Sequence, residues 1–352
     1  MLLTLLLACK DAAIDSANPC VHTHDAAVVV TVSRDYATGS FATIDLDSHE
    51  VCDELFLTSG DPGVAVSGGV VYQFNRFGYD NLRAFTPGEW SRPRWERELG
   101  DAANPQDVAL CAGRLFVSLY GRAELAILSP DTGDQLGVVD LSAFDDGDGV
   151  GPEPGGLVVE GDQLFVGMNR LDRENGWVDR GGAVAQIDCD TGAVAQSWSV
   201  AGDTRVKPWL DGEGVLAAGR PFGDQAGGLW VITGEGPRLL IDDALLEGEL
   251  AGVAAFGDRA ILTSLSDDYS AYGVWCADLS AGTVRSLGNS TSFLTDLAAN
   301  ERGEAWLTAH WGWQDPEASV AGLSVYDIGA CEERTAGAPL TLSLAPYAVS
   351  FL

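Results

Sequence analysis

Short apolar stretches joined by glycine-containing turns recur along the whole chain. An apolar strand leads through such a turn to a second apolar strand, a variable polar loop follows, and two further strands complete the pattern. Copies of the first two strands occupy residues 63–76, 107–122, 156–170, 206–220, 252–266 and 296–310. Helical periodicity is absent, so the pattern predicts an all-β fold and excludes a parallel α/β sheet.

The spacing of the copies indicates which all-β fold is present. The residues that close the second strand are Ser33, Asn75, Tyr120, Asn169, Gly219, Ser266 and His310, at separations of 42 to 50 residues. Four short strands per 40–50 residues are typical of one blade of a β-propeller. We therefore predict a propeller of four-stranded antiparallel blades.

The two ends of the pattern predict how the propeller closes. The first blade starts at Val28 and lacks its innermost strand, whereas the tail at residues 346–351 has the form of such a strand. Pairing of this tail with the first blade would close the ring and protect its strand edges. Six complete repeats and one split repeat predict seven blades in a single domain at residues 26–352.

Charge limits the possible partners. The 352-residue chain has 52 acidic and 20 basic residues, a formal net charge of −32, and its only lysines are Lys10 and Lys207. Nucleic-acid binding requires clustered lysine and arginine to neutralise phosphates, so this class is excluded. We expect a monomer with an acidic, highly soluble surface.

The first residues predict export. Residues 1–8 (MLLTLLLA) form an apolar run that ends in a small residue and precedes Cys9. This pattern is typical of a signal peptide, and Leu6–Cys9 looks like a bacterial lipobox, in which the cysteine becomes lipidated. We expect attachment through Cys9 to the outer membrane or cell surface, with residues 9–25 as a flexible lead. A buried N-terminal strand is the alternative.

The other six cysteines permit disulfides in an exported protein. They are Cys20, Cys52, Cys111, Cys189, Cys276 and Cys331, and none forms a CxxC pair that would suggest zinc or redox chemistry. Six cysteines allow 15 pairings. We predict one of these pairs, Cys20 with Cys52, because the two cysteines flank the strands of the first blade.

Three segments show a resemblance to known proteins. They read NRFGYDN (75–81), DLSAFDDGDGVGPEP (140–154) and NRLDREN (169–175). With the repeats, they make the chain resemble seven-bladed propellers of the YVTN and NHL-like kind, and more narrowly propeller lipoproteins of predatory and environmental bacteria. The broad resemblance covers about residues 25–352 and implies the fold, but it carries over no activity.

One face of the predicted propeller is a candidate binding site. The loop after the second strand carries an arginine in five blades, and aromatic residues lie in the same set of loops. The face includes Arg34, Arg76, Arg122, Arg170, Arg220, His310, Trp311 and Trp313. Guanidinium groups around a central opening could bind carboxylate, phosphate or sulfate. The alternative is that these arginines pair with acidic residues and hold neighbouring loops together.

A calcium site is the candidate for a cofactor. Asp145, Asp146 and Asp148 alternate with glycines, and Glu153 follows closely. Clustered carboxylates on a tight turn offer the hard oxygen ligands that Ca²⁺ prefers. The EF-hand spacing is absent, so a solvated acidic loop is the alternative.

These observations favour a binding protein. We expect an envelope-anchored propeller that binds an anionic small molecule, a glycan or an envelope protein. The chain contains no GxSxG, HExxH or phosphate-loop motif. The alternative is a metal-dependent propeller enzyme of the lyase or lactonase type that uses His310.

Overall fold

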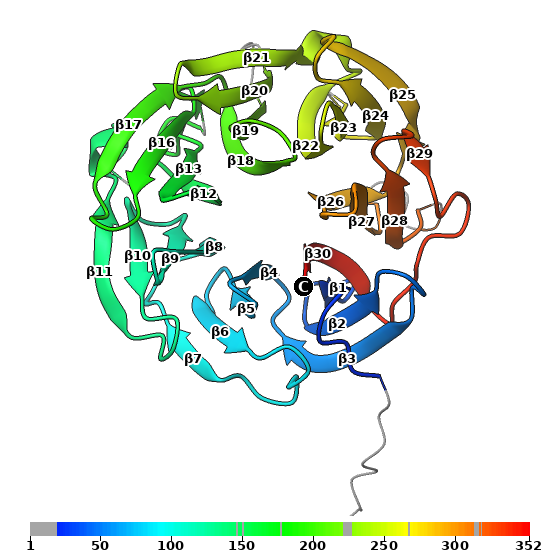
Figure 1. Ribbon diagram of the computed structural model, residues 1–352, viewed down its shortest axis with the longest axis horizontal. Helices are drawn as coiled ribbons and strands as arrows, with labels where there is room; N and C mark the ends of the chain where they lie inside the picture. Colours follow the sequence, from blue (N-terminus) through cyan, green and yellow to red (C-terminus); the bar gives the residue numbers. More distant parts are fainter. Residues whose placement is uncertain are drawn as a thin grey trace, which may run out of the picture.

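The computed structural model describes residues 20–145, 147–149, 151–176, 178–220, 227–266, 268–312, 317 and 319–352. Its four-stranded units are arranged around a central axis, and each unit has one strand at the inside and one at the outside (Figure 1). Apart from the 3₁₀ turns η1 (Ser142–Phe144) and η2 (Asp243–Leu245), the regular elements in the described residues are strands.

Five sheets have four antiparallel strands each. They are β30 (Ala345–Phe351), β1 (Ala26–Val32), β2 (Gly39–Asp45) and β3 (Val51–Thr58); β4 (Pro62–Ser67), β5 (Val70–Asn75), β6 (Asn81–Phe85) and β7 (Trp95–Glu98); β8 (Pro105–Cys111), β9 (Arg114–Leu119), β10 (Glu124–Leu128) and β11 (Gln135–Asp140); β12 (Pro154–Glu160), β13 (Gln163–Met168), β16 (Ala183–Asp188) and β17 (Val194–Ser199); and β26 (Phe293–Ala299), β27 (Glu304–His310), β28 (Gly322–Asp327) and β29 (Glu332–Glu333). The hairpin β14 (Leu171–Asp172) and β15 (Val178–Asp179) extends one loop.

The remaining eight strands form one continuous sheet. It contains β18 (Asp203–Leu210), β19 (Val215–Arg220), β20 (Gly228–Thr233) and β21 (Gly236–Asp242), followed by β22 (Glu249–Phe256), β23 (Arg259–Leu265), β24 (Tyr272–Asp278) and β25 (Thr283–Ser290). The expectation of seven separate four-stranded sheets is therefore corrected to five, because Trp209 and Leu210 pair in parallel with Ala255 and Phe256 and join two units.

The last strand belongs to the first sheet. Residues of β30 pair antiparallel with β1, from Ala27 opposite Phe351 to Val32 opposite Ala345. All seven residues of β1 are buried. The C-terminal strand therefore supplies the inner neighbour that β1 needs.

Seven hydrophobic clusters hold neighbouring four-stranded units together. Each cluster in the described residues combines side chains from two units that follow one another around the axis, and one of them joins the last unit to the first. Trp306 of β27, for example, packs with Val29 of β1 and Val349 of β30. The core is therefore a ring of interfaces between units.

The inner strands are also linked by side chains at four junctions. In each case an amide of one inner strand donates to a side-chain oxygen of the preceding one. The bonds are Val66 N to Ser350 Oγ (3.0 Å), Leu110 N to Ser67 Oγ (2.9 Å), Leu157 N to Asp107 Oδ2 (2.8 Å) and Val349 N to Asp296 Oδ2 (3.1 Å). These bonds satisfy amides that an isolated sheet edge would leave without a partner.

Three disulfides add covalent links. Cys111–Cys189 connects the sheet of β8–β11 to the next sheet, and Cys276–Cys331 connects β24 to the turn before β29. The third disulfide joins Cys20 to Cys52 of β3, the pair singled out in the sequence. The described end of the expected flexible lead is thus fixed to the outer strand of the first sheet.

Candidate functional site

A central cavity of about 620 Å³ lies on the axis of the ring. All seven inner strands (β4, β8, β12, β18, β22, β26 and β30) contribute to its wall, and Figure 1 shows these strands around the centre. Small and apolar side chains form much of the wall. The polar lining residues include Arg76, Gln106, Asp107, Tyr120, Asn169, Asp203, Arg205, Lys207, Asp296 and Tyr347.

Strand β18 supplies the most charged part of the wall. Asp203, Arg205 and Lys207 alternate along the strand, and side chains two residues apart share one face. Between them, Thr204 and Val206 are buried on the other face. The alternation therefore places one carboxylate and two cations on the cavity wall.

Lys207 is held by a carboxylate from β26, the second inner strand after β18. Its Nζ lies 3.3 Å from Asp296 Oδ1 of β26. Asp296 also accepts hydrogen bonds from the amides of Leu297 (2.9 Å) and Val349 (3.1 Å). The ammonium group is oriented by these contacts and still borders the cavity.

Asp107, like Asp296, is a carboxylate on the cavity wall that accepts hydrogen bonds from two backbone amides. The amides of Val108 and Leu157 donate to it over 2.7 and 2.8 Å. The pKa of Asp107 is raised to about 6: burial raises it most and nearby Asp296 adds to this, whereas the two amides and Lys207 favour the charged form and limit the rise. Asp107 therefore changes charge in a mildly acidic range.

Replacement of Asp107 by asparagine tests this pKa. The folded value of about 6 lies above the ordinary value of 3.8, so the folded wild type binds more protons between these pH values and loses stability as the pH rises. The introduced amide would not titrate, although it loses acceptor capacity at every pH. Between about pH 4 and about pH 6, we expect the unfolding free energy of the wild type to fall relative to that of Asp107→Asn. Urea denaturation across this range measures it, and a constant difference would contradict the assignment.

Arg205 differs from the other two cavity cations. Arg76 is paired with Asp61 (2.7 Å) and donates to Gln106 (3.1 Å). Arg205 is exposed and lines the cavity, and its guanidinium makes no hydrogen bond or ion pair with the described residues. A smaller pocket of about 50 Å³ beside the cavity is lined by Arg205, Lys207 and Asp296. An unpaired guanidinium next to an ammonium group is an arrangement that suits an anion.

Asn169 adds an unused hydrogen-bond acceptor. Its side chain is 4% exposed and lines the cavity, and its Oδ1 has no hydrogen-bond partner among the described residues. Its Nδ2 donates to Tyr120 Oη at 3.4 Å. Because a buried polar atom costs free energy without a partner, Asn169 Oδ1 can accept a hydrogen bond from a ligand.

Four of the five arginines expected on the face have partners within the chain. Arg34 lies 3.7 Å from Glu317, Arg122 donates to the Asp101 carbonyl (3.1 Å), and Arg170 donates to the carbonyls of Phe144 (3.0 Å) and Gly181 (3.1 Å). Arg76 is paired as described above. The side chain of Arg220 lies outside the described residues. These contacts favour the alternative in which the four described arginines hold neighbouring loops together.

Acidic residues in or near these loops have other partners. Asp35, Asp80 and Asp107 accept backbone amides, Asp172 pairs with Arg180, and Asp296 pairs with Lys207.

His310 is enclosed and does not line the cavity. Its ring is 2% exposed and stacks on Tyr36 at a centroid distance of 4.7 Å, with Trp311 edge-on. Burial lowers the pKa of His310, because the charged imidazolium is poorly solvated there. Trp311 is partly buried, and Trp313 lies outside the described residues.

The acidic loop does not form a ligand set in the described residues. Glu153 is fully buried, lies 2.9 Å from Arg173 and accepts a hydrogen bond from the Leu171 amide (3.0 Å). Asp145 Oδ1 accepts from the Gly147 amide, and Asp148 accepts from the Arg173 amide. Asp146 and Cys9 lie outside the described residues. Asp145 thus stabilises its own turn, whereas Asp148 and Glu153 hold the neighbouring segment at residues 171–173.

From the sequence we predicted that the loop residues form the binding site. We did not predict that Arg205, Lys207 and Asn169 line one cavity. The available signal was the alternation of charges at 203, 205 and 207, around the start of the repeat copy predicted at residues 206–220. Across the described residues, we find no helix with the length and apolar character needed to span a membrane.

Comparisons with known proteins bear on the fold. No family model and no curated protein matches the chain. Solved structures do: the propeller domain of Cps50 (Swd1) from Myceliophteria thermophila has a TM-score of 0.61 and 13% identity, and covers 88% of this chain and 99% of its own. The fold is a β-propeller.

Other propellers of similar structure differ in their named roles. Hydrazine synthase from Kuenenia stuttgartiensis has a TM-score of 0.58 and 14% identity, with 91% of this chain and 99% of that chain covered. The propeller domain of the Trilobed protease from Pyrococcus furiosus, described with an open velcro topology, has a TM-score of 0.55 and 9% identity, covering 89% and 94%. At these identities the likeness shows the fold alone, so the function has to be argued from the cavity.

Proposed function

We propose that the protein is a binding propeller that takes a small anion into its central cavity. The observation that carries the proposal is Arg205, an arginine on the cavity wall whose guanidinium has no ion pair or hydrogen bond to the described residues. In a chain with a net charge of −32, a free cation is readily neutralised by one of the many carboxylates. Because the guanidinium of Arg205 pairs with none of the described carboxylates, it is available to a ligand.

Neighbouring groups indicate the kind of anion. The ammonium of Lys207 lies two residues along the same face of β18, and Asn169 Oδ1 offers an acceptor on the same cavity wall. Carboxylate, phosphate and sulfate all accept from a guanidinium fork and an ammonium group. A hydroxyl on the same ligand could donate to Asn169. We therefore propose an anionic small molecule rather than an extended glycan or a protein as the ligand.

No specific observation favours the lyase or lactonase alternative. That reaction was expected to use a metal and His310, and His310 is packed between Tyr36 and Trp311 instead of lining the cavity.

The architecture that we propose has seven blades. The eight-stranded sheet consists of two four-stranded antiparallel units that share only a two-residue parallel pairing. Seven hydrophobic clusters between consecutive units, including the cluster between the last unit and the first, support counting it as two blades. The pairing of β30 with β1 supports closure of the ring.

We also propose that the protein is exported and lipid-anchored. The run MLLTLLLA before Cys9 supports this location, and the three disulfides suit an oxidising compartment. Attachment would be through Cys9 to the outer membrane or cell surface.

Arg205→Gln tests the binding site. Using inorganic phosphate and citrate as probes, we expect titration calorimetry to show binding to the wild type at low salt. The variant should lose at least about tenfold in affinity, because hydrogen bonds to charged groups contribute roughly 1.5–3 kcal/mol.

The matched control is Arg238→Gln. Arg238 is also exposed, and its side chain makes no hydrogen bond or ion pair with a described residue, but it lies on the outer strand β21. The Arg238→Gln substitution should leave the affinity for both probes unchanged. Equal losses in both variants, or no binding of either probe to the wild type, would contradict an anion site at Arg205.

A further inference from the structure

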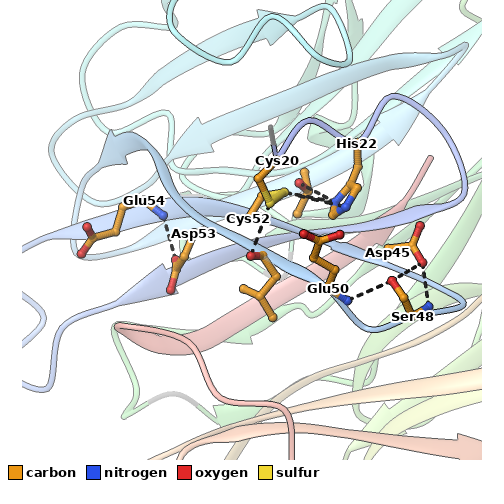
Figure 2. The surroundings of a disulfide bond; sticks show 10 residues. Cys20, His22, Asp45, Ser48, Glu50, Cys52, Asp53 and Glu54 are labelled. Atoms are coloured by element: carbon orange, nitrogen blue, oxygen red, sulfur yellow. Dashed lines mark hydrogen bonds between the residues drawn. A yellow bond between two sulfur atoms is a disulfide. The ribbon is translucent and has the colours of Figure 1, made fainter. Parts of the chain in front are cut away.

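The disulfide between Cys20 and Cys52 has an imidazole beside it (Figure 2). Nδ1 of His22 lies 3.5 Å from Cys52 Sγ, and Nε2 lies 3.8 Å from it. The two sulfur atoms and the imidazole nitrogen all lie within 4.8 Å of one another. In the described residues, no other group of three histidine, cysteine or acidic side chains comes together in this way.

We propose that reduction of this disulfide converts Cys20, Cys52 and His22 into a site for a zinc-like divalent cation. A dithiol reductant transfers two electrons and two protons to the S–S bond, leaving two cysteine thiols and an oxidised reductant. Binding of Zn²⁺ then displaces both thiol protons to solvent, and neutral imidazole is the third ligand. Solvent takes the fourth position.

The distances already fit such a site. In tetrahedral zinc coordination, with Zn–S about 2.3 Å and Zn–N about 2.0–2.1 Å, a sulfur and a nitrogen ligand are roughly 3.6 Å apart. The two imidazole nitrogens lie 3.5 and 3.8 Å from Cys52 Sγ. The main movement required is therefore separation of the two sulfur atoms once their bond is broken.

The second nitrogen of His22 has its own partner. Nδ1 lies 3.1 Å from Thr43 Oγ1 of β2. If Nδ1–H donates to this hydroxyl, Nε2 carries the free lone pair that a metal needs. An outer hydrogen bond of this kind is typical of metal-binding histidines, because it fixes the ring orientation and the tautomer.

This disulfide is also the one that a reductant can reach. Cys20 is partly exposed, whereas the other five bonded cysteines are at most 6% exposed. The acidic side chains of Asp45, Glu50 and Asp53 surround the site (Figure 2). Their negative charge raises the local concentration of divalent cations.

Cobalt titration tests the proposal on the full chain. After mild dithiol treatment, differential alkylation with mass spectrometry establishes that Cys20 and Cys52 are free. We then expect one equivalent of Co²⁺ to give an intense thiolate-to-metal charge-transfer band, which Zn²⁺ abolishes. Carboxylates alone cannot produce this band, so cation binding elsewhere on the acidic surface is distinguished.

Two histidine variants decide whether the site is specific. His22→Ala should weaken Co²⁺ binding at least about tenfold, since outer partners alone typically contribute 10–100-fold. His24→Ala is the matched control, because His24 lies two residues away and contacts Asp25 instead. No charge-transfer band with both thiols free, or equal affinity in wild type and His22→Ala, would overturn the proposal.

Discussion

Deletion of residues 346–352 is expected to leave a chain that unfolds or aggregates. The deletion removes nearly all of β30, so the fully buried strand β1 loses its inner hydrogen-bonding neighbour. It also removes Val349, whose amide donates to Asp296, and Ser350, whose hydroxyl accepts from Val66. An apolar, unpaired strand edge promotes association with other chains. Circular dichroism and size-exclusion chromatography measure the outcome.

A peptide added in trans provides the control for this deletion. A synthetic peptide of residues 344–352 supplies the same strand without the covalent link, so it should restore part of the soluble, folded population. A soluble truncated protein with the wild-type spectrum and melting temperature would contradict the role assigned to β30.

Trp306→Ala is expected to destabilise the protein by about 3–5 kcal/mol. Trp306 is fully buried, and its ring packs edge-on against His49 and Phe351 at centroid distances of 5.8 and 5.9 Å. It fills the interface between the last unit and the first, so alanine leaves a cavity where the chain ends meet. The variant also removes the Nε1 hydrogen bond to Glu304, whose carboxylate keeps Asn300 and Arg334 as partners.

Trp306→Phe separates the contribution of the buried ring volume from that of the Nε1 hydrogen bond. Phenylalanine keeps most of the ring packing but cannot donate to Glu304, so its cost should be clearly smaller than that of alanine. Chemical denaturation of both variants measures the two values. Equal costs would show that the hydrogen bond, rather than the filled volume, makes this position important.

The fold could be predicted because each blade repeats its own pattern. Alternating apolar residues, glycine turns and a period of 42 to 50 residues specify four-stranded units, and the tail at 346–351 indicated the partner of the first strand. The join at Trp209 and Leu210 could not be predicted, because it depends on how closely two inner strands approach. Pairing between units leaves no periodic signal in the sequence.

The candidate site was harder to predict. Repeated arginines drew attention to the loops, but Arg76, Arg122 and Arg170 are occupied by nearby acceptors that sequence spacing does not show. Arg205 matches no repeat, and the alternating charges at 203, 205 and 207 do not show that its guanidinium lacks a partner. Periodicity thus predicts what the blades share, whereas the cavity depends on what single inner strands do differently.

The disulfide at Cys20 has a mechanical consequence. It connects the chain before β1 to the outer strand β3, so tension on the N-terminal segment is carried through a covalent bond to β3. The load thereby bypasses β1, whose hydrogen bonds to β30 would otherwise be peeled apart one at a time from the end at Ala27 and Phe351. Force applied through this segment would therefore leave the pairing of β1 with β30 unloaded.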